Sequence, residues 1–162
     1  MLVNSEAQMI GSVRRWHSMA HILVIDDHPH VRDLFRDVLE DDGYRVTVAA
    51  DGYDGIQSCR GALPDLVIVD LQMPGQDGLD TIRQLRAAHH ELPIIAMSGG
   101  NHDHGVNVLE TAHGLGAVRT FEKPISLTEF GTLVRDVLRS HDTHEPGRDL
   151  GSPLPSRFRP PP

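Results

Sequence analysis

The feature that most constrains this chain is a series of short, almost uninterrupted runs of valine, isoleucine and leucine. The run from Leu66 to Val69 contains no polar residue, which is typical of a strand buried on both faces of a parallel sheet. Stretches with helical periodicity separate these runs. Five strands alternating with five helices predict a doubly wound α/β fold with right-handed crossovers. The predicted strands are 21–25, 44–49, 65–69, 93–97 and 117–121.

Turn and capping residues support the helical segments. Pro29 stands where the first helix begins and Gly43 where it ends. Ser126 and Glu129 have the spacing of a capping box at the start of the last helix. The segment 103–114 is the weakest helix candidate, because it has few apolar positions.

A chain of 162 residues is expected to form one domain. Residues 1–19 show no sustained period and are predicted to be an N-terminal extension without stable structure. Residues 20–140 are predicted to form the folded domain. Residues 141–162 hold six of the chain's eleven prolines, the first of them Pro146. This segment is predicted to be a disordered tail.

The charge and the cysteine content exclude several functional classes. The net charge is −8, and the segment 21–139 carries about −9, so direct nucleic-acid binding is not expected. Cys59 is the single cysteine, so no disulfide can form within the chain, and it is interpreted as a small apolar residue. No apolar run is long enough to span a membrane, and Arg14-Arg15 lack the apolar region of an export signal. A cytoplasmic location is predicted.

Polar side chains stand at the carboxyl ends of the predicted strands, where ligands bind in open α/β sheets. Asp26-Asp27 follow the first strand, Asp70 the third, Ser98 the fourth and Lys123 the fifth. Three carboxylates in one place repel each other, and Mg²⁺ relieves this repulsion with the oxygen ligands that it prefers. With a hydroxyl and an ammonium nearby, this set could hold a phosphoryl group on an aspartate.

Each of these residues also has a simpler interpretation. The Asp26-Asp27 pair could favour a helix N-terminus, Asp70 could open a turn, and Ser98 could cap a helix. Lys123 could be a solvated charge, but it is the only lysine among fifteen basic residues, which favours a need for a compact point charge. The eleven histidines are interpreted as surface imidazoles, although close pairs such as His28 and His30 leave metal binding open.

The chain contains four motifs in order: DDHP at 26–29, DLQMPGQDG at 70–78, MSGG at 97–100 and FEKP at 121–124. Together they resemble the receiver domains of bacterial two-component response regulators. The resemblance covers about residues 21–139. It implies a flavodoxin-like sheet with strand order 2-1-3-4-5. It also implies that Asp70 is the phosphoacceptor, that Asp27 ligates Mg²⁺ directly and Asp26 through water, and that the backbone carbonyl of Gln72 is a further ligand.

The resemblance further implies that Ser98 hydrogen-bonds the phosphoryl group, that Lys123 pairs with it, and that the Lys123-Pro124 bond is cis. The sequence departs from the family at one position. The aromatic residue usual three positions before the lysine is Thr120 here, and Phe121 follows one position later. Because successive residues in a strand face opposite sides, the usual aromatic switch is not expected in its usual form.

The expected function is that of a stand-alone response regulator and not a turnover enzyme. A sensor histidine kinase or a histidine phosphotransfer protein would donate the phosphoryl group. The chain would then bind a separate output protein through about 103–139, or pass the phosphoryl group on in a relay, as a monomer or weak dimer. An aspartyl-phosphate phosphatase resembling haloacid dehalogenases is the second candidate, but Gln72 stands where such enzymes carry an acid/base aspartate. A degenerate receiver that only binds partners is the third.

Overall fold

The computed structural model describes residues 20–75, 78–100 and 107–142. Its centre is a sheet of five parallel strands in the order β2-β1-β3-β4-β5. This confirms the predicted doubly wound fold and the predicted strand order. The strands are β1 (His21–Ile25), β2 (Arg45–Ala49), β3 (Leu66–Asp70), β4 (Ile94–Ser98) and β5 (Arg119–Glu122).

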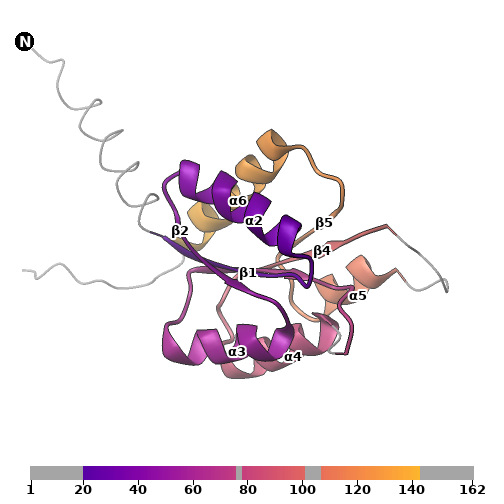
Figure 1. The fold of residues 1–162 in the computed structure, drawn as a ribbon. Coiled ribbons are helices and arrows are strands. Elements are labelled where there is room, and N and C mark those ends of the chain that lie inside the picture. Colours follow the sequence, from indigo (N-terminus) through magenta and orange to yellow (C-terminus); the bar gives the residue numbers. More distant parts are fainter. Residues whose placement is uncertain (1–19, 76–77, 101–106, 143–162) are drawn as a thin grey trace, which may run out of the picture.

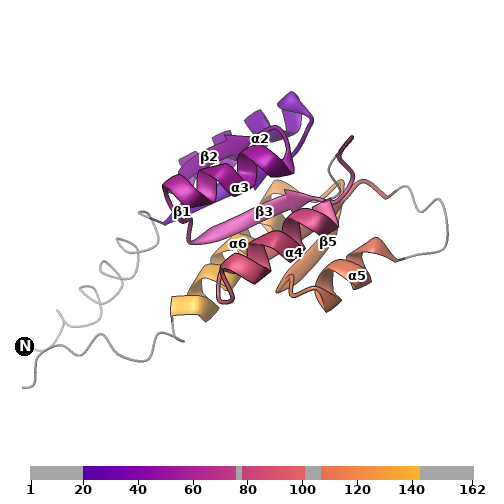
Figure 2. The same cartoon turned by 90° about the horizontal axis from the view of Figure 1, so that it is seen from below.

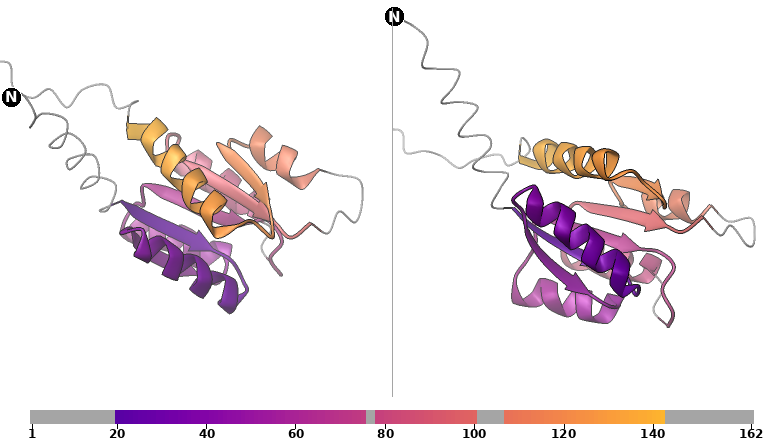
Figure 3. Two further views of the ribbon diagram at one scale, coloured as in Figure 1. Left: turned by 90° about the horizontal axis from the view of Figure 1, so that it is seen from above. Right: turned by 45° about the horizontal axis from the view of Figure 1, so that its top comes forward.

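Helices cover both faces of the sheet (Figure 1). One face carries α3, α4 and α5, which lie in front of the strands in Figure 2. The other face carries α2 and α6, which lie side by side and in contact (Figure 3). The helices are α2 (Pro29–Asp41), α3 (Gly52–Gly61), α4 (Gly78–Ala88), α5 (Val108–Gly114) and α6 (Leu127–Asp142).

The layers explain why the strands read as continuous apolar runs. Along β3, Val67 and Val69 pack into the core under α3, α4 and α5, whereas Leu66 and Ile68 pack into the core under α2 and α6. Both sets of side chains have zero solvent exposure. Helices cover both faces of this central strand. A polar side chain on either face would be buried without a hydrogen-bond partner, so both faces are apolar.

Most predicted boundaries agree with the structure to within one or two residues. Pro29 begins α2, and Ser126 and Glu129 form reciprocal hydrogen bonds at the start of α6, as a capping box requires. The helix α5 begins at Val108, and residues 103–106 of its predicted range lie outside the described residues. The predicted N-terminal extension and most of the predicted tail also lie outside them.

Two further features bear on the predictions. The Lys123-Pro124 peptide bond is cis, as the resemblance implied. Phe121 packs against Phe35 and Phe130 under α2 and α6, with ring centroids 6.5 and 6.0 Å away.

Among the described residues, no helix is long and apolar enough to cross a membrane.

Candidate functional site

The carboxyl ends of the strands bring the predicted site residues to one edge of the sheet. Asp26 follows β1 directly, and Asp70 is the last residue of β3, the strand that pairs with β1. Ser98 ends β4, which pairs with β3, and Lys123 follows β5. Arg32, on the first turns of α2, donates to the backbone carbonyl of Asp26 at 2.6 Å. This contact holds the end of β1 in place beneath the helix.

A single ammonium group links two buried carboxylates. The Nζ atom of Lys123 donates a hydrogen bond to Oδ2 of Asp26 at 3.1 Å and lies 3.4 Å from Oδ2 of Asp70. The side chain of Asp26 is fully buried, and that of Asp70 is 1% exposed. Lys123 thus partly neutralises two like charges that would otherwise repel each other in a low-dielectric environment.

Burial raises the pKa of the Asp70 carboxyl group above its ordinary value. The positive charge of Lys123 acts in the opposite direction, the negative charge of Asp26 adds to the rise, and the backbone N–H of Gln72 opposes it. This N–H donates to Oδ1 of Asp70 at 3.3 Å. The carboxylate of Asp70 is therefore held in a position where its charge is only partly compensated by the protein.

Two further polar side chains of the site come from the end of β4 and from the loop after β3. The Oγ atom of Ser98 is buried and has no hydrogen-bond partner among the described residues. The side-chain oxygen of Gln72 accepts a hydrogen bond from the backbone N–H of Gly99 at 3.2 Å. A Cβ atom at position 99 would lie 2.9 Å from that oxygen, so a residue without a side chain allows this approach.

His28 is an exposed histidine, as the sequence predicted, and its side chain also contacts the acid pair. Its Nδ1 atom lies 2.9 Å from Oδ1 of Asp27 and 3.3 Å from Oδ1 of Asp26. Its backbone N–H donates to Oδ1 of Asp26 at 2.8 Å. The only signal in the sequence was its position directly after the acid pair, because neither periodicity nor burial distinguishes it from the other histidines.

The donor atoms fit a divalent cation. One ligand atom from each of Asp26, Asp27, His28 and Asp70 can be chosen so that all lie within 4.8 Å of one another. Oδ1 of Asp27 is buried and accepts no hydrogen bond from the described residues, although Nδ1 of His28 lies 2.9 Å away, so it retains the capacity to bind a cation. The mainly carboxylate set is of the kind that binds hard cations in proteins.

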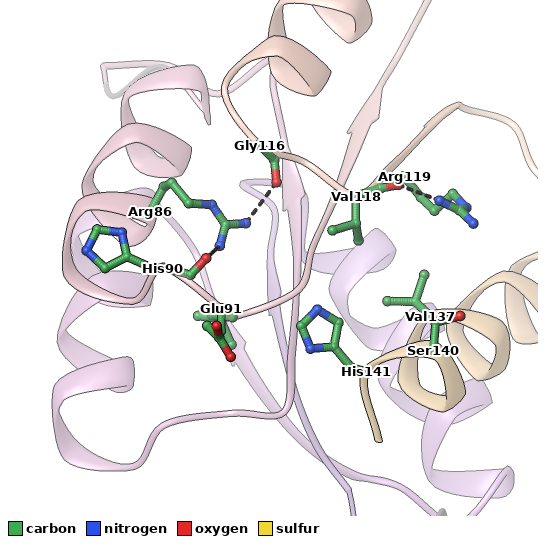
Figure 4. Close-up of a pocket in the computed structure, with 10 residues that line it drawn as sticks. Arg86, His90, Glu91, Gly116, Val118, Arg119, Val137, Ser140 and His141 are labelled. Carbon is green, nitrogen blue, oxygen red and sulfur yellow. Dashed lines mark hydrogen bonds between the residues drawn. The ribbon is translucent and has the colours of Figure 1, made fainter. Parts of the chain in front are cut away.

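Two hollows lie at opposite ends of the strands. The first, about 760 Å³, opens beside the carboxylates and is lined by Asp27, His28, Gln72 and neighbouring residues. The second, about 570 Å³, lies at the other end, between Arg86 on α4, Val118 before β5, and Val137 and His141 on α6 (Figure 4). There the Arg86 guanidinium donates to the backbone carbonyls of His90 and Gly116, so it joins two loops of the fold.

Comparisons with known proteins agree with this arrangement. Residues 22–135 match the family profile of the response regulator receiver domain. "Response regulator MprA" of Mycobacterium sp. strain KMS is 37% identical over 120 residues, which are 73% of this chain and 50% of that protein. The counterpart from Mycobacterium bovis strain BCG is 36% identical over the same share. The chain thus spans about half the length of these curated relatives.

Solved structures show the same fold. The receiver domain of NtrX from Brucella abortus has a TM-score of 0.69 at 28% identity, over 74% of this chain and 98% of that one. A receiver domain protein from Clostridium thermocellum has a TM-score of 0.71 at 24% identity, over 77% and 98% of the two chains, which is a likeness of fold. The profile match, the MprA relatives and the acidic edge of the sheet lead to one conclusion: this chain belongs to the response regulator receiver domain family.

Proposed function

We propose that this chain accepts a phosphoryl group on Asp70 in the presence of Mg²⁺, and that the modified form changes its binding to a partner. The observation that carries the proposal is the contact of one ammonium, Lys123, with both Asp26 and Asp70, beside an acid cluster that can hold a metal. A buried carboxylate with a cation on one side and a metal position on the other is suited to attack phosphorus.

The transfer needs few groups besides the acceptor. A carboxylate oxygen of Asp70 forms the new O–P bond while the N–P bond of a phosphohistidine donor breaks, and the bonding electrons leave with the imidazole nitrogen. Lys123 is placed to pair with the incoming phosphoryl oxygens, because its Nζ atom already lies 3.4 Å from the acceptor carboxylate. The hydroxyl of Ser98, which has no hydrogen-bond partner among the described residues, would be a donor for the same oxygens.

Asp26, Asp27, Asp70 and the backbone carbonyl of Gln72 are the proposed metal ligands. A bound Mg²⁺ would supply positive charge to the phosphoryl oxygens. His28 lies at the rim of this site, where its side chain is 64% exposed.

Partners and output follow from the same proposal. The donor is a sensor histidine kinase or a histidine phosphotransfer protein, and the chemistry is self-modification without turnover of a substrate. Signalling would proceed through a shift in population toward a form that binds a partner. Action as a stand-alone regulator stays a prediction, because the relatives are about twice as long as the matched region.

The test is intact-mass analysis after incubation with acetyl phosphate. Wild type is expected to gain one phosphoryl group with Mg²⁺ present and none after chelation. The Asp70→Asn variant is expected to gain none. Asp37→Asn is the matched control, because Asp37 is an exposed aspartate on α2 and should not affect the gain.

Rapid hydrolysis could hide a phosphorylated form, so binding of beryllofluoride, a stable phosphoryl mimic, provides a second measurement. Wild type that neither gains the phosphoryl group nor binds beryllofluoride would refute the proposal. The chain would then be a receiver fold that acts by docking alone.

A further inference from the structure

The side chain of His28 turns toward the acid pair instead of capping its helix. His28 is the N-cap residue of α2, yet its side chain makes no capping hydrogen bond. Its Nδ1 atom lies 2.9 Å from Oδ1 of Asp27 and 3.3 Å from Oδ1 of Asp26. An exposed N-cap histidine without a role would be free to point into solvent, and this one places a nitrogen donor beside two carboxylate oxygens.

These separations are those of an ion pair with Asp27 and a hydrogen bond with Asp26, and they also match the edge of a coordination polyhedron. Ligand atoms at about 2.1 Å from a metal lie about 3.0 Å apart when they occupy neighbouring octahedral positions. The Nδ1–Oδ1 distance of 2.9 Å to Asp27 is close to this value, and all four candidate donors fit within 4.8 Å. Within the part of the chain that the structure describes, Oδ1 of Asp27 is buried and accepts no hydrogen bond, so a ligand role is open to it.

We propose that His28 is a nitrogen ligand of this site for transition-metal ions such as Ni²⁺ and Zn²⁺, and that it shifts the metal preference of the site away from Mg²⁺. The inference rests on the proposed function only in that both use the same carboxylates. Neutral imidazole suits Ni²⁺, Zn²⁺ and Cu²⁺, whereas Mg²⁺ prefers oxygen ligands and water. Loss of the imidazole should therefore weaken the two classes of metal unequally.

A purely electrostatic role predicts the opposite result. If His28 were only a positive charge beside Asp26 and Asp27, its removal would strengthen the binding of every divalent cation, by a similar factor for each. If it is a ligand, its removal weakens Ni²⁺ binding and leaves the affinity for Mg²⁺ much less affected. The ratio of the two affinities thus separates the two roles.

The experiment is calorimetric titration of the full chain with Mg²⁺ and with Ni²⁺, for wild type, His28→Ser and two controls. Serine is a favoured N-cap residue, so the substitution should preserve α2, and thermal unfolding checks this. His30→Ser is the matched control, because His30 is an exposed histidine in the first turn of the same helix. Asp70→Asn identifies which binding event belongs to the acid cluster.

We expect His28→Ser to lower the Ni²⁺ affinity about 10- to 100-fold and to change the Mg²⁺ affinity about threefold or less. His30→Ser should change neither. In the Cu²⁺-loaded protein, pulsed electron paramagnetic resonance should detect the remote nitrogen of a coordinated imidazole in wild type and His30→Ser, and lose that signal in His28→Ser.

Equal changes in the Ni²⁺ and Mg²⁺ affinities, or an imidazole signal of equal intensity in wild type and His28→Ser, would overturn the inference. In either case Mg²⁺ binding and phosphoryl gain by wild type would remain, so the proposed function would be unaffected. A wild-type protein that binds Ni²⁺ through His28 but neither binds Mg²⁺ nor gains a phosphoryl group would support the inference and refute the proposed function.

Discussion

Gln72 reaches across the site from the loop after β3. Its backbone N–H contacts the Asp70 carboxylate, and its side-chain oxygen accepts from the N–H of Gly99 in the loop after β4. The side chain of Gln72 thus joins the loop after β3 to the loop after β4, and we expect it to affect a water molecule that attacks the proposed phosphoryl group.

We expect Gln72→Ala to change the lifetime of the phosphorylated form by about 2- to 10-fold, most simply by lengthening it, since an amide that orients the attacking water would be lost. The measurement is the decay of the phosphorylated mass after the phosphodonor is removed. Gln57→Ala, on the exposed surface of α3, is the control. An unchanged lifetime in Gln72→Ala would end the idea.

His21 links the stability of the fold to pH. It is 6% exposed at the start of β1, and its Nε2 atom lies 2.8 Å from the hydroxyl of Thr47. Burial lowers the pKa of its imidazole from the ordinary value of 6.5, and the positive charge of Arg45 acts in the same direction, while Asp65 opposes it. The folded chain therefore binds a proton on His21 less readily than the unfolded chain does.

The sign follows from this difference. Well above pH 6.5 the imidazole is neutral in both the folded and the unfolded state. As the pH falls through 6.5, the unfolded state binds a proton on His21 before the folded state does, so the free energy of unfolding decreases. We expect this decrease to be smaller in His21→Gln, which keeps a hydrogen-bonding group for Thr47 but does not titrate. Urea unfolding of both proteins at several pH values between 7.5 and 5 measures it, and parallel curves would contradict the expectation.

At the residue scale, the sequence was most informative where strand ends carry chemistry. Asp26, Asp70 and Lys123 could be placed together because parallel strands end at one edge, and their contacts agree with that expectation. The orientation of the His28 side chain could not be predicted. It depends on a side-chain torsion at a helix start, and no periodicity in the sequence reports such a torsion.

The start of α4 packs very closely on the end of β3. A Cβ atom at Gly78 would lie 2.2 Å from the backbone oxygen of Asp70 and 2.6 Å from the Cα atom of Leu71. Backbone atoms cannot turn aside as a flexible side chain can. Gly78 therefore sets the distance between this helix and the strand that ends in the proposed acceptor.

We expect Gly78→Ala to lower the free energy of unfolding by about 2–4 kcal/mol, because the helix must move away from β3. Gly61→Ala is the matched control, since a Cβ atom there would have no neighbour within 4 Å, and it should be neutral or stabilising by up to about 1 kcal/mol. Urea unfolding measures both, and equal effects of the two substitutions would refute the explanation.

At the element scale, helices and strands with a clear apolar period could be predicted from the sequence, whereas a helix with few apolar residues could not be delimited. The aromatic contacts of Phe121 with Phe35 and Phe130 fit the expectation that its side chain faces away from that of Thr120. The extent of α5 was harder to predict, because only Ala112 is buried among its seven residues. A helix with so little apolar surface carries almost no periodic signal.

For the molecule as a whole, α5 is the element in which we expect the largest change on activation. Asn107 caps it by accepting from the N–H of Glu110, but the helix has only seven residues, of which Ala112 alone is fully buried. We expect Mg²⁺ and beryllofluoride together to slow amide hydrogen exchange several-fold in residues 108–114, because the activated form would order this helix. The helix α3, on the same face, should change much less. Identical exchange with and without the phosphoryl mimic would count against this expectation.

The buried hydroxyl of Ser98 has a consequence for the balance between the resting and the activated forms. A buried donor without a partner raises the free energy of the state that contains it by about 1–3 kcal/mol. If Asp70 is phosphorylated as proposed, a phosphoryl oxygen that accepts from this hydroxyl would remove the deficit and so favour the phosphorylated form. By thermodynamic reciprocity, a partner that selects that form would also raise the affinity of the site for the phosphoryl mimic.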